Sequence, residues 1–368
     1  MKIESVTLHQ IRMPLLSPFT TSFGTEHNRP CLIVEVAGES LTGYGECVAG
    51  DGPWYSYETI GTARHVMQEW LIPRLLQADI EHPAAVWDLF APIRGHNMAK
   101  AALEMACWDL AARLEGIPLA RLLGGTRDRV PVGVSVGIQA SPDALVQTVD
   151  GFLTDGYRRI KLKIEPGRDE AWVRQVRSAF PDTLMQVDAN SAYTPADAEL
   201  FQRMDDLNLL LIEQPLAYDD IVDHAALQRL LRTPLCLDES IHSPDDARHA
   251  LELGSCRIIN IKAGRVGGHR RSREIHDLCL ARGVPVWCGG MLETNIGRAH
   301  NVALASLPGF SLPGDISASA RYYARDVAGP DFVLNDDSTL TVPGGPGIGV
   351  EPNRAALAAM ASEEVVSL

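Results

Sequence analysis

RRIKLKI, at residues 158–164, is the first of five short apolar runs that decide the fold of this chain. The others are TLMQVDAN at 183–190, NLLLIEQP at 208–215, PLCLDES at 234–240 and CRIINIKAG at 256–264. Each run carries a charged residue near its end, and these five recur at intervals of 25, 25, 25 and 24 residues: Lys163, Asp188, Glu213, Asp238 and Lys262. Such a period is about the length of one strand, one helix and two short loops. The pattern predicts a βα repeat with five charged groups on one rim.

Further strands extend this repeat to eight. We expect strands at 130–138, 158–164, 183–188, 208–213, 234–238, 257–262, 284–288 and 310–313, with amphipathic helices between them. Ser141-Pro142, Thr194-Pro195 and Ser243-Pro244 resemble helix N-caps followed by proline. Eight parallel strands with intervening helices close as a barrel. An open doubly wound sheet is the alternative, but its single switch point would not spread charged groups over five consecutive strand ends.

The first part of the chain has another pattern. Residues 1–125 begin with β-rich stretches and continue with helical ones, which indicates an α+β domain. We expect residues 126–324 to form the barrel that carries the active site. The tail, about 325–368, is expected to pack back on the first domain. The predicted fold class is therefore α/β, a modified TIM barrel, (β/α)7β, with an N-terminal α+β capping domain.

Composition limits the possible partners. The 368 residues are 46% hydrophobic and 22% charged, which is typical of a soluble globular protein, and the net charge is −14. This charge argues against nucleic acid and anionic membranes as partners. It is compatible with a small carboxylate substrate if a bound cation inverts the local field. The N-terminus lacks a signal-peptide pattern and no run reaches transmembrane length, so we expect a cytoplasmic protein. The seven scattered cysteines are expected to be reduced and buried.

Two lysines on the first run are candidates for proton chemistry. Side chains alternate along a strand, so Lys161 and Lys163 point to the same face. Helices cover the outer face of a parallel barrel, which places both lysines inside it. Burial near other cations lowers the pKa of a lysine and makes it a plausible base. We expect Lys163 to be catalytic and Lys161 to give electrostatic support.

Three acids at consecutive strand ends predict a metal site. Asp188, Glu213 and Asp238 would repel one another without a cation, and oxygen-only ligands suit Mg²⁺ or Mn²⁺ better than zinc. Helix capping explains one or two such acids but not three. Nearby polar groups are expected to orient the ligands: Asn190, Gln214, Glu239 and Ser240. Glu239 has an alternative role as an acid that stabilises a helix dipole.

The position of Lys262 completes the arrangement. It follows the sixth predicted strand, and Lys163 follows the second, so the two lie opposite each other in an eight-stranded ring. A substrate chelated to the metal would have one lysine on each face of its reacting carbon. This arrangement suits removal of a proton α to a carboxylate and its delivery to the other face, with the metal stabilising the enediolate.

KLK, DAN, EQP, DES and NIKAGRVGG, in this order, resemble the enolase superfamily and its muconate-lactonizing-enzyme subgroup. TSFGT, GHNMAKAALEMACWD, YRRIKLKIEPG, PVWCGGMLET and LPGDISAS are more similar to its N-acylamino acid racemase/o-succinylbenzoate synthase family. The resemblance covers essentially the whole chain. It implies Asp188, Glu213 and Asp238 as metal ligands, Lys163 and Lys262 as the acid/base pair, and a loop at about 17–25 that closes over the substrate. It also implies Mg²⁺, replaceable by Mn²⁺ or Co²⁺, and a homo-oligomer, either an octamer or a dimer.

The resemblance also implies residues around the substrate. Trp287-Cys288-Gly289 has no histidine like that of the mandelate racemase type, and Asp315-Ile316-Ser317 lacks the second aspartate with which dipeptide epimerases hold an ammonium. Arg265 matches an arginine of racemase-capable members, or it is a rim arginine paired with an acid. The residues expected near the substrate are Asn190, Glu239, Arg265, Ser135, Phe19, Tyr55, Gly290, Met291, Glu293 and Asp315. Tyr55, with Trp54, is equally consistent with packing in the cap.

The predicted activity is racemisation of N-acylamino acids, most of all N-succinylamino acids, by two-base 1,1-proton transfer. The alternative is o-succinylbenzoate synthase, a syn-dehydration in menaquinone biosynthesis that uses one lysine as base and the other as a cation, and one site can have both activities. A further alternative is a non-catalytic barrel that has only a binding or structural role. The complete set of predicted metal ligands and lysines argues against it.

Overall fold

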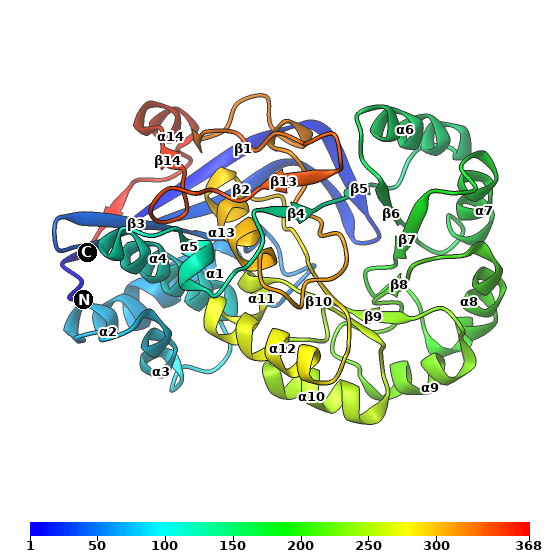
Figure 1. The fold of residues 1–368 in the computed structure, drawn as a ribbon, viewed down its shortest axis with the longest axis horizontal. Coiled ribbons are helices and arrows are strands. Elements are labelled where there is room, and N and C mark those ends of the chain that lie inside the picture. Colours follow the sequence, from blue (N-terminus) through cyan, green and yellow to red (C-terminus); the bar gives the residue numbers. More distant parts are fainter.

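A computed structural model describes residues 1–368. Its centre is a curled sheet of seven parallel strands in sequential order (Figure 1). The strands are β5 (Val134–Val136), β6 (Arg159–Lys163), β7 (Leu184–Asp188), β8 (Ile212–Glu213), β9 (Leu235–Leu237), β10 (Ile258–Ile261) and β11 (Val286–Cys288). Adjacent strands pair in register so that Lys163 lies opposite Asp188, and Asp188 opposite Glu213. The predicted α/β class and the parallel repeat are confirmed.

The predicted eighth strand, 310–313, is wrong. Only Phe310 forms a bridge there, to Val286. Pro313 has no amide hydrogen to donate to a ladder, and it ends the segment before a strand can form. The segment nevertheless spans the gap in the sheet, because Asp315 N–H donates to Cys288 O and Gly133 N–H donates to Gly314 O.

The first predicted strand, 130–138, is also wrong as one element. It is divided into β4 (Arg129–Pro131) and β5 (Val134–Val136). β4 leaves the parallel sheet and pairs with β13 (Thr339–Thr341) in antiparallel orientation. Gly133, between them, lies directly beside the buried side chain of Arg159, where a Cβ atom would collide with the guanidinium.

Helices alternate with the strands and lie outside the sheet (Figure 1). They are α6 (Pro142–Thr154), α7 (Glu170–Ala179), α8 (Ala198–Met204), α9 (Val222–Leu230), α10 (Pro244–Leu253), α11 (Ala263–Val266), α12 (His269–Ala281) and α13 (Asn295–Ala305). Two predicted N-caps are confirmed, since the hydroxyls of Ser141 and Ser243 accept hydrogen bonds from Ala144 N–H and Asp246 N–H. Thr194-Pro195 starts a short 3₁₀ turn before α8.

The N-terminal residues form an antiparallel sheet and a group of helices. β1 (Ser5–Thr21), β2 (Gly24–Gly38) and β3 (Leu41–Cys47) pair in sequence. The helices are α1 (Ile60–Val66), α2 (Ile72–Gln77), α3 (Val86–Phe90), α4 (Asn97–Glu115) and α5 (Leu119–Leu122). α4 is buried along nearly its whole length and packs on β3. The expected α+β capping domain is therefore present.

Packing of α4 on β3 depends on two glycines. A Cβ atom at Gly43 would lie 2.2 Å from Ala106 O, and one at Gly45 would lie 2.1 Å from Ala102 O. Tyr44 and Glu46 alternate with them and so point to the other face of the sheet. The sequence GYGE thus brings a helix against one face and leaves polar groups for the other.

The C-terminal tail contacts both parts of the molecule. β13 pairs with β4 beside the barrel, whereas α14 (Arg354–Met360) packs on β1 and β15 (Val366–Ser367) pairs with it. β12 (Ala328–Gly329) pairs with β14 (Glu351–Pro352) within the tail. The division of the chain at residue 125 stays a prediction.

The predicted loop at 17–25 is the tip of the β1–β2 hairpin rather than an irregular loop. The ladder shifts register between Pro14 and Phe19 and then continues to Thr21–Gly24. The tip reaches the barrel, since Thr20 O accepts a hydrogen bond from Ile138 N–H and the hydroxyl of Ser22 donates to Asn190 O. In Figure 1 this hairpin extends across the molecule to β5.

Two expectations concern the rest of the chain. All seven cysteines are unpaired and buried, as predicted. None of the helices combines the length and the apolar character that crossing a membrane requires.

Candidate active site

A cavity of about 390 Å³ lies between the cap and the rim of the sheet. The cap supplies the β1–β2 hairpin and the segment around Tyr55, and the barrel supplies the strand ends. Ten of the residues predicted from the sequence line it: Phe19, Tyr55, Ser135, Lys161, Lys163, Asn190, Lys262, Gly290, Met291 and Asp315. The structure therefore brings residues more than 250 positions apart into one pocket.

The inward face of β6 is a column of cations. Arg159, Lys161 and Lys163 occupy alternate positions of the strand, and the first two are almost completely buried. Alternation places all three inside the curled sheet. Arg159 was not among the predicted residues, although its position in RRIKLKI has the same parity as the two lysines.

Lys161 lies among three carboxylates. Its Nζ is 3.0 Å from Asp188 Oδ2, 2.9 Å from Glu213 Oε2 and 2.5 Å from Asp315 Oδ2. Burial lowers the pKa of Lys161, but the three carboxylates raise it far more, so the net pKa is well above its usual range. Lys161 is therefore held as a permanent cation.

Lys163 has a different environment. Its Nζ donates to Asp188 Oδ2 at 2.6 Å and to Asn190 Oδ1 at 2.7 Å. Burial lowers the pKa of Lys163, Asp188 raises it, and Lys161 lowers it again, so the net pKa is below its usual value. Lys163 thus differs from Lys161 in the direction of its shift.

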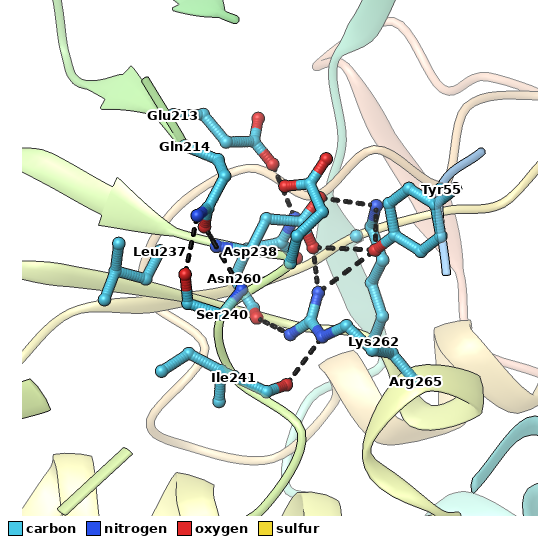
Figure 2. Close-up of polar contacts among 12 residues, drawn as sticks. Tyr55, Glu213, Gln214, Leu237, Asp238, Ser240, Ile241, Asn260, Lys262 and Arg265 are labelled. Carbon is cyan, nitrogen blue, oxygen red and sulfur yellow. Dashed lines mark hydrogen bonds and ion pairs between the residues drawn. The ribbon is translucent and has the colours of Figure 1, made fainter. Parts of the chain in front are cut away.

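Lys262, on the other side of the cavity, is grouped with Tyr55, Asp238 and Arg265 (Figure 2). Lys262 Nζ donates to Asp238 Oδ2 at 2.8 Å and to the Tyr55 hydroxyl at 3.0 Å. Arg265 donates to Asp238 Oδ1 through Nη1 and to Ile241 O through Nε. Arg265 is thus paired with an acid, Asp238, and this contact is compatible with both interpretations of Arg265.

Asn260 and Gln214 orient the acids without lining the cavity themselves. Asn260 Nδ2 donates to Glu213 Oε1 at 2.7 Å, and Gln214 Oε1 accepts from the backbone N–H groups of Asp238 and Ser240 (Figure 2). Asn260 was not predicted. The sequence does contain an indication of its position: Asn260, on β10, lies two residues before Lys262, so the two side chains are expected on the same face.

The acids have the chemistry of a hard-cation site. Asp188, Glu213 and Asp238 are at most 1% exposed, and in this structure each is turned to a lysine or arginine, so no three acidic or imidazole groups converge. Glu239 Oε2 is buried without a partner. Burial and then repulsion from Asp188 raise the pKa of Glu239 to about 7 and raise that of Glu213. Such repulsion among oxygen donors is what a divalent cation would relieve, so this donor set fits Mg²⁺.

Three of the residues predicted near the substrate do not line the cavity, and neither do the three predicted metal ligands. Glu239 accepts a hydrogen bond from Asn190 Nδ2 at 2.9 Å and lies behind it. Arg265 lies behind Tyr55 and Lys262. Glu293 accepts from Asn301 Nδ2 and points toward α13. Each is one contact away from the cavity rather than on its surface.

Comparison with known protein families finds two matches along the chain. Residues 2–124 match the mandelate racemase/muconate lactonizing enzyme N-terminal domain, and residues 144–356 match the enolase C-terminal domain-like family. The chain belongs to the enolase superfamily. It is an enzyme of the mandelate racemase/muconate lactonizing enzyme group.

Individual relatives of this superfamily member have two kinds of names. The o-succinylbenzoate synthase of Geobacillus kaustophilus is 54% identical over 96% of this chain and 94% of its own length. The N-succinylamino acid racemase of Amycolatopsis is 52% identical over 96% and 95%. A crystal structure of an enolase superfamily member from Listeria innocua superposes with a TM-score of 0.96, at 42% identity over 100% of this chain and 99% of the other.

Proposed function

We propose that the protein racemises N-acylamino acids, in particular N-succinylamino acids, with a bound divalent cation. One observation carries this proposal: Lys163 and Lys262 line the same cavity from β6 and from the end of β10. Between them lie three strands: β7 and β8 end with Asp188 and Glu213, and β9 is followed directly by Asp238. A planar carbon held over these acids would have one ammonium on each side.

Asp188, Glu213 and Asp238 would hold the cation, with Mg²⁺ as the best match to their oxygens and Mn²⁺ or Co²⁺ as substitutes. When bound, it would supply positive charge to the substrate carboxylate as that group becomes an enediolate. The lysines now paired with the acids would turn toward the substrate. Asn260, which donates to Glu213, would keep that carboxylate in place.

In the proposed reaction Lys163 and Lys262 act as the two bases. Starting from one enantiomer, the neutral lysine on one face removes the α-proton, and the ammonium on the other face delivers a proton to the same carbon. The roles reverse for the other enantiomer. Lys161 stays charged throughout and stabilises the carboxylate side of the substrate electrostatically.

The second candidate activity is o-succinylbenzoate synthase. The names of relatives at 54%, 52% and 49% identity favour it as strongly as racemisation. This dehydration would use one of the two lysines as base and the other as a cation beside the ring. Both activities in one site are consistent with the same residues.

The deciding experiment follows exchange of the α-proton with solvent deuterium, by NMR, for both enantiomers of N-succinylphenylalanine, with the dehydratase substrate assayed in parallel. We expect the wild type to exchange and racemise both enantiomers. Lys163→Ala and Lys262→Ala should each lose racemisation by at least about 100-fold and retain exchange of one enantiomer only, a different one in each variant.

Chelation of divalent metal should abolish all of these activities, and added Mg²⁺, Mn²⁺ or Co²⁺ should restore them. Exchange without racemisation in the wild type would rule out two-base transfer. Dehydration without exchange of either enantiomer would leave the synthase as the sole activity.

A further inference from the structure

Asp315 is an acid of the cavity wall that is not one of the proposed metal ligands. Asp315 is 7% exposed and lines the cavity. Both oxygens are engaged by cations: Oδ1 accepts from Arg159 Nη1 at 2.6 Å, and Oδ2 lies 2.5 Å from Lys161 Nζ. Burial raises the pKa of Asp315, but Lys161 and Arg159 lower it more, so this carboxylate is ionised.

Arg159 is built into the floor beneath Asp315. Its side chain is fully buried, and its second nitrogen, Nη2, donates to Pro313 O at 2.9 Å. The guanidinium lies over the ring of Trp287, 5.7 Å from its centroid, and fills the space left by Gly133. Because Arg159 is fixed on three sides, it cannot leave Asp315 when a ligand enters.

The charge of this part of the cavity wall determines whether it favours a charged ammonium or an uncharged amide of the ligand. A carboxylate with a free oxygen would attract an ammonium, and removal of one neighbouring cation would make the charge of this desolvated pocket more negative by one unit. Here each oxygen of Asp315 already contacts a cation, Oδ1 that of Arg159 and Oδ2 that of Lys161. An ammonium placed there would also meet two positive groups.

A neutral partner is available instead. The hydroxyl of Ser135 is buried, lines the cavity and has no hydrogen-bond partner. Ser135 pairs with Lys161 in the β5–β6 register, so it lies on the same side of the cavity. A hydroxyl can donate to or accept from an uncharged amide.

From these contacts we propose that Arg159 is a specificity-determining residue that neutralises Asp315 and thereby excludes substrates with a free ammonium in the acyl group. The inference rests on the proposed function, since it concerns the acyl group of the same substrates. Arg159 does not reach the reacting carbon. It acts only through Asp315.

The test uses two ligands that differ by a single ammonium, N-propionyl-L-phenylalanine and L-alanyl-L-phenylalanine. Their dissociation constants are measured by calorimetry in the presence of Mg²⁺ for the wild type, Arg159→Met and Arg159→Lys. We expect the wild type to prefer the propionyl ligand. Arg159→Met should shift the ratio of the two constants at least about tenfold toward the alanyl ligand, whereas Arg159→Lys should keep the wild-type ratio.

Two controls separate charge from damage to the fold. Arg298→Met removes another buried arginine, which binds the backbone of Ile316 and Ser317 but not the Asp315 carboxylate, and should change both constants equally. The double variant Arg159→Met with Asp315→Asn removes both charges and should return the ratio toward that of the wild type. If Arg159→Met does not fold, Arg159→Gln makes the same charge change and keeps a donor for Asp315.

An unchanged ratio in a folded Arg159→Met or Arg159→Gln variant would overturn the inference. Failure of the proposed function has a different signature, namely absence of α-proton exchange with N-propionyl-L-phenylalanine in the wild type. Binding and exchange are measured separately, so either result can be recognised without the other.

Discussion

Asn260 is a single residue whose effect on the site can be isolated. Its Nδ2 donates to Glu213 Oε1, and it lies inside the sheet without touching the cavity. Replacement by leucine preserves the size of the side chain but leaves Glu213 without this donor. We expect Asn260→Leu to weaken Mg²⁺ binding by about 10- to 100-fold, as loss of partners that orient ligands commonly does. Calorimetric titration with Mg²⁺ measures this directly.

Asn301→Leu is the matched control for Asn260. This asparagine is also buried, and it donates to Glu293 Oε1 instead of to a proposed ligand. It should lower stability without changing the affinity for Mg²⁺. Equal affinities in Asn260→Leu and the wild type would show that Asn260 has only a packing role.

His300 provides a pH dependence away from the proposed metal ligands. His300 Nε2 contacts Tyr44 O at 2.8 Å, and its Nδ1 contacts His269 Nε2 at 2.9 Å. Burial lowers the pKa of His300 to about 4, a shift that the hydrogen bond to Tyr44 only partly offsets. The unfolded chain therefore binds more protons between pH 6.5 and pH 4, and stability falls as the pH falls through this range.

His300→Gln should reduce this loss of stability. The glutamine keeps a donor near Tyr44 O and does not titrate. Between pH 7 and pH 4 we expect the wild type to lose about 3 kcal/mol more than the variant, the equivalent of its shift in pKa. Urea unfolding of both proteins at several pH values measures this difference in stability. The buried glutamates are present in both proteins, so their contributions cancel in the comparison. Parallel pH curves for the two proteins would contradict the prediction.

At the scale of residues, alternation along strands explains what the sequence predicts well. It placed Lys161 and Lys163 inside the sheet, and the same parity applies to Arg159 and Asn260, which were overlooked because they do not follow the 25-residue interval. Which acid each cation contacts depends on strand register and on side-chain reach. Asp315 therefore could not be assigned to Arg159, 156 positions earlier, from the sequence.

At the scale of elements, close contact between α4 and β3 is set by glycine. Gly45→Ala would place a Cβ atom 2.1 Å from Ala102 O, a backbone atom that cannot move alone. We expect a loss of about 1–3 kcal/mol in the free energy of unfolding, since the helix and sheet must separate locally. Gly151→Ala is the opposite case, in the middle of α6 with no atom near its Cβ position, and should stabilise by about 0.5–1 kcal/mol. Thermal and urea unfolding of both variants test the contrast, and equal effects would exclude close packing as the cause.

Elements were predicted best where caps and apolar runs coincide. α6 and α10 begin at the predicted Ser-Pro pairs, and β6 and β7 lie within one residue of the predicted strands. Prediction failed where hydrogen bonds between distant backbone segments determine the secondary structure. Residues 310–313 have the composition of a strand, but the prolines and the neighbouring 131–133 segment determine which hydrogen bonds form. The hairpin tip at 17–25 likewise depends on pairing between β1 and β2 that no local pattern specifies.

At the scale of the whole molecule, buried carboxylates of the cap hold helices of the barrel. Glu46, on β3, accepts from Thr294 N–H and Gly297 N–H at the start of α13. Glu104, on α4, accepts from His269 N–H and Arg270 N–H at the start of α12, and from Trp108 Nε1. Each glutamate satisfies amide groups that a helix N-terminus leaves free. The cap thereby fixes the helix that follows Lys262 and Arg265, and a cavity built from both parts needs this rigid attachment.

Glu104→Ala tests whether cap and barrel form one cooperative unit. The substitution leaves two backbone N–H groups and one indole N–H buried without acceptors, which should cost about 3 kcal/mol or more in the free energy of unfolding. Burial raises the pKa of Glu104 to about 7, so the measurement is made at pH 8, where the carboxylate is charged. Glu115→Ala, at the exposed end of the same helix, should change stability by less than about 0.5 kcal/mol. Urea unfolding followed by tryptophan fluorescence and by circular dichroism should give one coincident transition in all three proteins, at a lower midpoint in Glu104→Ala. If the two signals separated in the wild type, the cap and the barrel would unfold independently, and the glutamate contacts would not couple them.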